Sequence, residues 1–423
     1  MNKQTLREII IEQKKALDAE GSGVGRDNLK EVEKYFSLPH AVIIAGIRRA
    51  GKSTFLRQIM QYFKKEGFYY FNFEDERLID FYASDFNVLY EIFIELYGDK
   101  KIFFFDEIQN VKNWERFVRR MSDAGHKFFL TGSNASLLSR ELGTRLTGRH
   151  IAQTLFPFSF SEYLAFKDFK RDRDEFFDTK KRGIIKGYFN DYLREGGMPE
   201  YLCYGEKEAL KKVYNDILYR DIVARYDIRD VKALRELALY LASNLGSLFS
   251  YNGLKKFLGL GSANTAKAYV DYLENSFLFF SVEAYVTSLK KQIVANKKIY
   301  CADNGLADVV AFRFSEDRGK YLENLVFLEL KRRKEEVYYY KTENGLEVDF
   351  LLKKGIKPTD LIQVCWNMED KKTEKRELTG LLVAMEKFKL KKGLIITEDQ
   401  EETRQVSGKS IQIIPAWKWL LEN

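Results

Sequence analysis

Hydrophobic residues are spaced differently in successive parts of the chain, and this spacing predicts where strands and helices form. Between about residues 40 and 155, short apolar runs typical of buried strands alternate with amphipathic stretches typical of helices. The alternation predicts a parallel sheet with helices on both faces, and therefore an α/β fold. Before it, residues 3–37 have the pattern of two amphipathic helices around a polar, glycine-containing turn at 20–25.

The pattern changes again after residue 155. It becomes helical up to about residue 232, with a break at Gly196-Gly197-Met198-Pro199. Three short helices and two strands follow, which is the order of a winged helix. The last hundred residues begin with a helix at 321–330 and continue in strand-like runs. We therefore expect four regions: an α/β core with N-terminal helices at 1–155, a helical lid at 156–232, a winged helix at 233–302 and a small α/β domain at 303–423.

A glycine-containing loop follows the first apolar run of the core, 41–45. It reads Gly46-Ile47-Arg48-Arg49-Ala50-Gly51-Lys52-Ser53, with Thr54 next, and fits the pattern GxxxxGK[ST]. In such a loop backbone N–H groups and a helix N-terminus bind a polyphosphate, while Lys52 reaches the β- and γ-phosphates and Ser53 ligates Mg²⁺. The loop predicts a site for ATP and Mg²⁺, covered by the N-terminal helices. The alternative is a glycine-containing surface turn.

Polar residues end two later strands of the same core. Lys101 to Glu107 is a short apolar run that ends in two carboxylates, the form of a Walker B segment. We expect Asp106 to hold Mg²⁺ through water and Glu107 to orient and polarise the attacking water. Adjacent acids could instead cap a helix. The run from Lys127 ends in Thr131-Gly132-Ser133-Asn134, where Ser133 or Asn134 could contact the γ-phosphate or the water.

Composition narrows the class of protein. The chain has 423 residues, 45% of them hydrophobic and 15% aromatic, which excludes wholesale disorder and allows several domains. Its apolar runs are shorter than the roughly 20 residues of a membrane-spanning helix, and the N-terminus has no secretory hydrophobic segment. We therefore expect a soluble, cytoplasmic protein without a membrane partner. Three widely separated cysteines suggest neither disulfides nor a zinc cluster.

Positive charge is concentrated in the predicted winged helix. The formal net charge is +8, and residues 252–298 hold seven lysines against three acidic residues. The third helix of such a module enters the major groove of DNA, which points to Asn264, Thr265 and Lys267. Winged helices also serve as packing modules, and a lysine cluster is often a solvated face. The sequence therefore leaves open whether the partner is DNA or a protein.

The C-terminal domain imitates a PD-(D/E)xK nuclease, in which two acids bind Mg²⁺ and a lysine positions water. Glu323 on the helix and Asp349 on a strand have the right character. The next strand, however, reads Gln363-Val364-Cys365 where Glu-Val-Lys is expected. The missing carboxylate and lysine should weaken metal binding and water activation, so we expect a structural or binding role for these two acids.

Taken together, these motifs resemble the AAA+-type ATPases of archaea and bacteria that carry a C-terminal domain of uncharacterised function. The resemblance covers nearly the whole chain. It implies a five-stranded P-loop NTPase sheet, a lid, a winged helix and a restriction-nuclease-like tail that is often degenerate. The segments that carry it are Gly46 to Thr54, Phe103 to Gln109, Thr131 to Asn134, Leu146 to Arg149, Gly196 to Pro199 and Glu347 to Phe350.

The resemblance also proposes arginines that complete the site. Arg149 matches a position from which AAA+ relatives contribute an arginine finger to a neighbouring subunit, with Arg145 and Arg140 as weaker candidates. A salt bridge in a lid or at the surface is the alternative, and a homo-oligomer is therefore open. Arg220 and Asp221 also match a family pattern, as a sensor arginine or as a helix-stabilising ion pair.

The sequence thus predicts an ATPase that works as a nucleotide-driven conformational switch, with DNA as a candidate partner. Lys52, Glu107, Asn134 and Arg149 are the predicted catalytic residues, and Ser53 and Asp106 the predicted metal ligands. Two alternatives remain: an ATP-regulated nuclease that uses the C-terminal domain, and a nucleotide-gated binding protein with negligible turnover.

Overall fold

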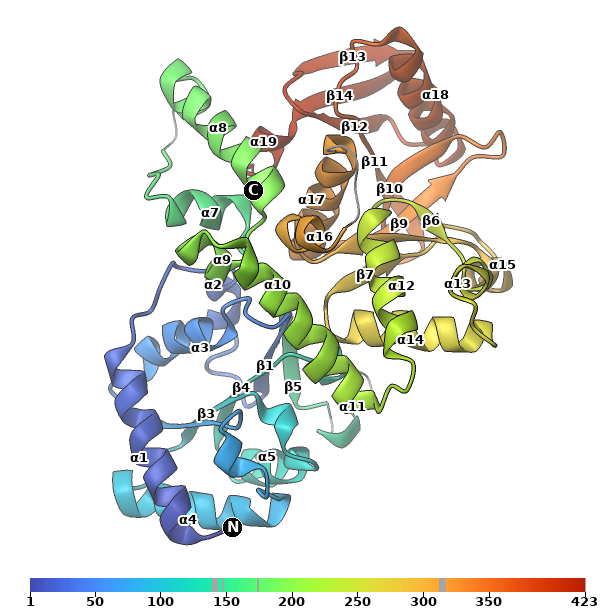
Figure 1. Cartoon of the computed structure of the whole chain (residues 1–423). Helices are drawn as coiled ribbons and strands as arrows, with labels where there is room; N and C mark the ends of the chain where they lie inside the picture. Colours follow the sequence, from blue (N-terminus) through green and yellow to red (C-terminus); the bar gives the residue numbers. More distant parts are fainter. Residues whose placement is uncertain (139–143, 147, 173–174, 312–316, 423) are drawn as a thin grey trace. The chain divides into compact units, whose positions relative to one another are not determined.

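The computed structural model describes residues 1–138, 144–146, 148–172, 175–311 and 317–422. The chain divides into two compact units (Figure 1). The first comprises residues 1–156 with 275–277, and the second comprises residues 157–274 with 278–423.

A five-stranded sheet forms the centre of the first unit. Its order is β2-β3-β4-β1-β5, and all four pairings are parallel. The predicted parallel α/β sheet is thereby confirmed. Its strands are β1 (Ala41–Ala45), β2 (Tyr69–Asn72), β3 (Ile102–Asp106), β4 (Lys127–Gly132) and β5 (His150–Thr154).

Helices cover both faces of this sheet, which explains why its inner strands β1, β3 and β4 are largely apolar runs. On one face, Phe104 and Phe129 stack on each other and pack near Phe55. On the other, Phe103 stacks on Phe128, and Phe86 stacks on Phe117. The helices are α1 (Lys3–Ala19), α2 (Leu29–Glu33), α3 (Lys52–Met60), α4 (Phe86–Tyr97) and α5 (Trp114–Asp123), with short 3₁₀ turns η1 (Gln61–Phe63), η2 (Glu76–Leu78), η3 (Ala83–Asp85), η4 (Ile108–Asn110) and η5 (Ala135–Leu138).

The second unit begins with a helical region. Its helix α8 ends at Gly196, whose φ is 74°, and Gly197 donates its N–H to Asp303 Oδ2 at 2.6 Å. A Cβ on Gly197 would lie 2.3 Å from Phe158 O, so the break in the pattern marks a place where only glycine fits. The elements are α7 (Phe160–Phe166), α8 (Thr179–Glu195), α9 (Pro199–Tyr204), α10 (Lys207–Asp216), the π-helical segment η6 (Ile217–Val223) and α11 (Ala224–Tyr226).

Three helices and a small antiparallel sheet come next. The sheet has the order β6-β8-β7, and α15 lies in the connection between β7 and β8. That short helix had no counterpart in the sequence pattern. The elements are α12 (Val231–Ser243), β6 (Leu248–Phe249), α13 (Tyr251–Leu258), α14 (Ala263–Asn275), β7 (Phe279–Val282), α15 (Leu289–Val294) and β8 (Lys297–Cys301).

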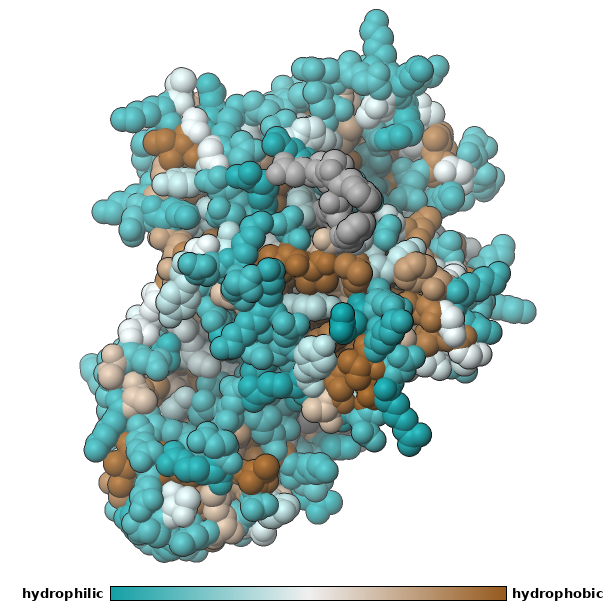
Figure 2. Space-filling view, viewed as in Figure 1, coloured by the Kyte–Doolittle hydropathy of each residue, from teal (hydrophilic) through white to brown (hydrophobic). Residues whose placement is uncertain are grey.

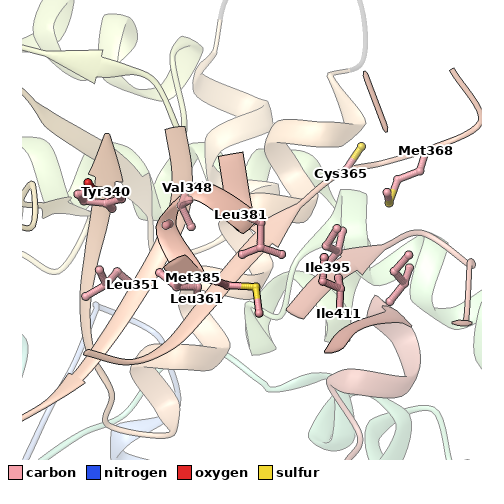
Figure 3. Close-up of a cluster of buried hydrophobic side chains, with 12 residues drawn as sticks. Tyr340, Val348, Leu351, Leu361, Cys365, Met368, Leu381, Met385, Ile395 and Ile411 are labelled. Carbon is pink, nitrogen blue, oxygen red and sulfur yellow. The ribbon is translucent and has the colours of Figure 1, made fainter. Parts of the chain in front are cut away.

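A six-stranded mixed sheet, in the order β13-β14-β12-β11-β10-β9, follows in the C-terminal part. Leu381 and Met385 of α18 join Leu351, Ile395 and Ile411 of the sheet in its hydrophobic core (Figure 3). The elements are α16 (Asn304–Val310), α17 (Arg318–Arg332), β9 (Glu336–Lys341), β10 (Glu347–Lys354), β11 (Lys357–Val364), α18 (Lys371–Lys387), β12 (Lys392–Thr397), β13 (Glu402–Val406), β14 (Lys409–Pro415) and α19 (Ala416–Trp419).

Candidate nucleotide-binding site

The loop after β1 turns directly into α3, and two glycines make the turn. Gly46 donates its N–H to Gly132 O at 3.2 Å, and a Cβ on it would lie 2.1 Å from Leu155 O. Gly51 precedes α3 with φ 91°, in the left-handed region that favours glycine. The backbone between them is therefore held between β4 and β5, with the N-terminus of α3 at its end. This cradle fits an anion, which helix N-termini attract.

Lys52 lies inside the loop with only 4% of its surface exposed. Its Nζ donates to Gly46 O at 3.3 Å and to Ile47 O at 3.2 Å. Glu107 Oε1 lies 3.4 Å from the same nitrogen. The lysine and the carboxylate proposed for water activation are thus in direct contact.

Asp106 and Glu107 are held by one hydroxyl group on the neighbouring strand. Thr131 Oγ1 donates to Asp106 Oδ1 and accepts the backbone N–H of Glu107 at 3.0 Å. Asp106 is fully buried, and its Oδ2 has no hydrogen-bond partner among the described residues. A buried carboxylate oxygen without a partner is a suitable ligand for a hard cation, so the residues fit Mg²⁺.

The two carboxylates differ in their electrostatic surroundings. Burial, and then the charge of Glu107, raise the pKa of Asp106 above its usual value. Burial also acts to raise the pKa of Glu107, but Lys52 and a hydrogen bond from Gln109 outweigh it, so the net pKa is lowered. Glu107 is therefore an ionised carboxylate at neutral pH, as a group that accepts a proton from water must be.

Gln109 links the second carboxylate to the end of β4. Its Nε2 donates to Glu107 Oε2 and, at 3.3 Å, to Ser133 Oγ. Glu107 itself has φ 50°, an uncommon conformation for a residue with a side chain. This turn aims its carboxylate back at Lys52 instead of continuing the strand direction.

The other predicted site residues surround this centre at different distances. Ser133 and Asn134 are buried, and Asn134 Oδ1 accepts the Ser136 N–H at 2.7 Å. Arg48 pairs at 2.7 Å with Glu74, which follows the end of β2. Arg49 has φ 62°, Ile47 and Ala50 are buried in the loop, and Thr54 accepts a hydrogen bond from Arg57 at 3.1 Å.

A buried arginine in the N-terminal segment also reaches the loop. Arg26 donates to Ala50 O at 2.8 Å and to Phe156 O at 2.6 Å. Gln58 of α3 donates to Ser22 O and Val24 O in the same segment. The polar turn at 20–25 is thereby fastened to the P-loop and α3. No sequence signal distinguished Arg26 or Gln58 from other polar residues of surface turns and helices.

Arg149 does not lie near this centre. It precedes β5, and its carbonyl accepts the N–H of Ala41, the first residue of β1. Lys52 follows the opposite end of β1, about 13 Å away along a five-residue strand. The Arg149 side chain is 56% exposed and pairs with Asp123. Arg145 pairs with Glu115 at 3.0 Å, and Arg140 lies outside the described residues.

Two further predicted groups belong to the second unit. Arg220 and Asp221 lie in the π-helical segment η6, where Asp221 is buried and Arg220 exposed. Asn264 and Lys267 are exposed near the start of α14, and Thr265 is half-buried.

Comparison with known proteins agrees with this geometry. Residues 39–164 match a family model described as an AAA domain, and 186–317 and 318–419 match two domains of unknown function, DUF8612 and DUF4143. An uncharacterized protein of Methanocaldococcus jannaschii is 37% identical over 397 residues, covering 90% of this chain and 88% of that protein. The chain belongs to this family of AAA-domain proteins. An uncharacterized member from Haemophilus influenzae is 31% identical, covering 94% of this chain and 99% of its own.

Two solved structures that match this AAA-domain protein are distant in sequence and structure. The Aeropyrum pernix ORC1 protein in complex with DNA is 12% identical, covers 70% of this chain and 94% of its own, and has a TM-score of 0.30. AMPPCP-bound DnaA from Aquifex aeolicus is 16% identical, covers 59% and 89%, and has a TM-score of 0.27. The fold assignment therefore rests on the strand order and the matched AAA domain.

The face in Figure 2 is largely hydrophilic. Over the described ranges, no helix is both long enough and apolar enough to cross a membrane.

Proposed function

We propose that this AAA-domain protein binds Mg²⁺-ATP at Gly46–Thr54 and hydrolyses it, using the cycle to switch conformation. The observation that carries this proposal is the contact between Lys52 and Glu107 at 3.4 Å beside the buried Asp106. A phosphate-binding cation, a metal-binding carboxylate and an ionised base thereby converge at the carboxyl ends of β1 and β3. This is the set of groups that phosphoryl transfer to water requires.

Each residue has a distinct task in the proposed reaction. Lys52 and the loop N–H groups bind the β- and γ-phosphates, while Ser53 and Asp106 hold Mg²⁺, which neutralises developing charge when bound. Glu107 orients water and accepts its proton. Gln109 keeps that carboxylate in place and connects it to Ser133, which supports a role for Ser133, and for its neighbour Asn134, in responding to the γ-phosphate.

The Glu107→Gln variant tests this assignment. The amide keeps the shape but cannot accept a proton, so ATP binding should persist while turnover falls about 100-fold or more. Binding of a fluorescent ATP analogue and release of phosphate measure the two separately. Glu115→Gln, which changes another buried glutamate of the same unit, is the matched control and should keep wild-type turnover. Hydrolysis at the wild-type rate by Glu107→Gln would show that another group activates water.

For the output of the switch we propose DNA, bound by residues 231–301 acting as a winged helix. The order of three helices and a three-stranded antiparallel sheet supports this proposal. So does the exposure of Asn264 and Lys267 near the start of α14. The phosphate backbone of DNA attracts an exposed lysine such as Lys267 independently of base sequence.

We also propose that Arg149 acts between two copies of the chain. It lies at the amino ends of β1 and β5, opposite the carboxyl end of β1 where the P-loop begins, which argues against its reaching the nucleotide site of its own unit. Among the described residues this exposed arginine pairs with a surface aspartate, Asp123, and it can exchange such a partner for a phosphate of a neighbouring copy at modest cost.

A further inference from the structure

A lysine lies buried at the centre of a carboxylate cluster in the second unit. Lys298 of β8 is 1% exposed. Its Nζ lies 2.9 Å from Glu323 Oε1, 2.7 Å from Glu347 Oε1 and 2.8 Å from Asp349 Oδ1. An ammonium group has three N–H bonds, so each of them has a carboxylate partner at the distance of a charge-assisted hydrogen bond.

The carboxylates come from two elements and are fixed from outside the cluster. Glu323 belongs to α17, and Glu347 and Asp349 are two residues apart on β10, where alternate side chains share a face. Asp349 Oδ2 accepts the N–H of Val364 at 2.9 Å, and Tyr300, two residues beyond Lys298 on β8, donates to Glu323 Oε1 at 2.8 Å.

Backbone also closes the cluster on one side. A Cβ on Gly246, whose φ is 68°, would lie 2.7 Å from Glu323 Oε2. The ring of Tyr300 stacks on Phe327 of α17 with centroids 4.2 Å apart. The side chains that form the cluster are therefore held in one arrangement by packing.

The oxygens that contact Lys298 are the ones a divalent cation would use. A helix glutamate and strand carboxylates that converge on one point are hard ligands for Mg²⁺ or Mn²⁺. A metal bound to the same three oxygens would occupy the space that Nζ now fills. In the part of the chain that the structure describes, no group of three or more His, Cys, Asp or Glu residues is arranged to hold a metal ion.

The two positions where a nuclease site would have its second acid and its lysine, 363 and 365, have structural roles in this chain. Cys365, where a lysine would position water, joins the hydrophobic core with Met368 and Ile395 (Figure 3). Burial raises the pKa of its thiol to about 11, so it stays neutral. Gln363 accepts the Asp349 N–H and donates to Glu377, so its amide is committed to holding β10 and α18.

We infer that the Lys298 ammonium replaces the divalent cation of a nuclease-like site, and that the C-terminal domain is a non-cleaving domain whose carboxylates fasten β8. Burial acts to lower the pKa of Lys298, but the three carboxylates raise it overall, so the charge is kept. Removing the ammonium leaves the buried Asp349 and the partly buried Glu323 and Glu347 without compensation. The same carboxylates then form a site for Mn²⁺ or Mg²⁺.

The full-length Lys298→Ala variant, without nucleotide, tests this inference. An Asp106→Asn change in all proteins removes the carboxylate proposed to hold Mg²⁺ at the nucleotide site. Titration with Mn²⁺, followed by calorimetry and by the thermal unfolding midpoint, should show one bound ion per chain and a midpoint raised by several degrees. The same chain with Lys298 intact should show neither. Adding Asp349→Asn should abolish the binding.

A neighbouring lysine supplies the matched control. Lys297 is half-buried on the same strand and pairs with Glu283 at 3.1 Å, so Lys297→Ala should not bind Mn²⁺. The inference fails if folded Lys298→Ala binds no Mn²⁺. If that variant does not fold, the chain with Lys298 intact is tested in its place. The inference is overturned if this chain binds Mn²⁺, or cleaves plasmid DNA with Mn²⁺, and if Asp349→Asn removes that binding or cleavage. It is supported if neither is observed. No readout depends on ATP hydrolysis, so the result is independent of the proposed ATPase activity.

Discussion

Lys52 has two competing uses at the P-loop. In the structure it lies against Glu107 and two loop carbonyls. In the proposed reaction, a triphosphate bound in the loop offers the Lys52 ammonium a stronger partner, which would leave the Glu107 carboxylate available to water. Nucleotide binding and activation of the base would then be coupled through one side chain. Until nucleotide binds, the ionised carboxylate of Glu107 has its charge compensated by Lys52.

Thr131, to which the sequence analysis gave no specific role, allows a test of how Asp106 and Glu107 are held. Thr131→Val keeps the shape but removes the hydroxyl that contacts Asp106 and the Glu107 N–H. A buried donor left without a partner costs about 1–3 kcal/mol. We expect a lower urea midpoint and turnover reduced about tenfold or more. Thr131→Ser, which keeps the hydroxyl, should behave as wild type; equal activity of both variants would remove Thr131 from the mechanism.

The P-loop residues could be predicted from the sequence because their motif is contiguous. Gly46, Gly51 and Lys52 act through local backbone geometry that their spacing encodes. Thr131 contacts partners 24 and 25 positions away, and Arg26 contacts a carbonyl 130 positions away. Neither pairing leaves a periodic or local signal, so only the folded chain brings them together.

Among the elements, strands with two buried faces were predictable, and the short helix α15 was not. The apolar runs of β1, β3 and β4 predict strands that helices cover on both sides. Helix α15 spans only Leu289–Val294, with Leu289, Ile293 and Val294 exposed. A run of six residues is too short for helical periodicity to be recognised.

Helix α14 is the element on which the DNA proposal can be tested. The double change Asn264→Ala and Lys267→Ala should weaken binding to duplex DNA and lower the slope of log affinity against log salt by about one, because one lysine no longer neutralises a phosphate. Fluorescence anisotropy across salt concentrations, with and without ATP, measures both. Lys375→Ala, at an exposed lysine of α18, is the control. Equal slopes for all three proteins, or no binding by the wild type, would exclude this use of α14.

At the scale of the whole molecule, the proposed role of Arg149 between copies would make the nucleotide site of a single copy incomplete. If a neighbour supplies this arginine, Arg149→Ala and Glu107→Gln should each be inactive alone. Their mixture should recover activity, because about a quarter of the interfaces in random assemblies would combine an intact Glu107 with an intact Arg149. Phosphate release from the mixture measures this. Arg145→Ala should stay active, and a mixture no more active than its components would confine Arg149 to a structural role.

The boundary between the two C-terminal family models falls between residues 317 and 318. Lys298 lies on one side of it, and Glu323, Glu347 and Asp349 lie on the other. Two segments that match separate family models therefore depend on each other, because the lysine of one compensates the carboxylates of the other. A chimaera that takes these two segments from different relatives keeps that balance only if the first donor also has a cation at position 298. Recombination at this boundary is constrained by a single ammonium group.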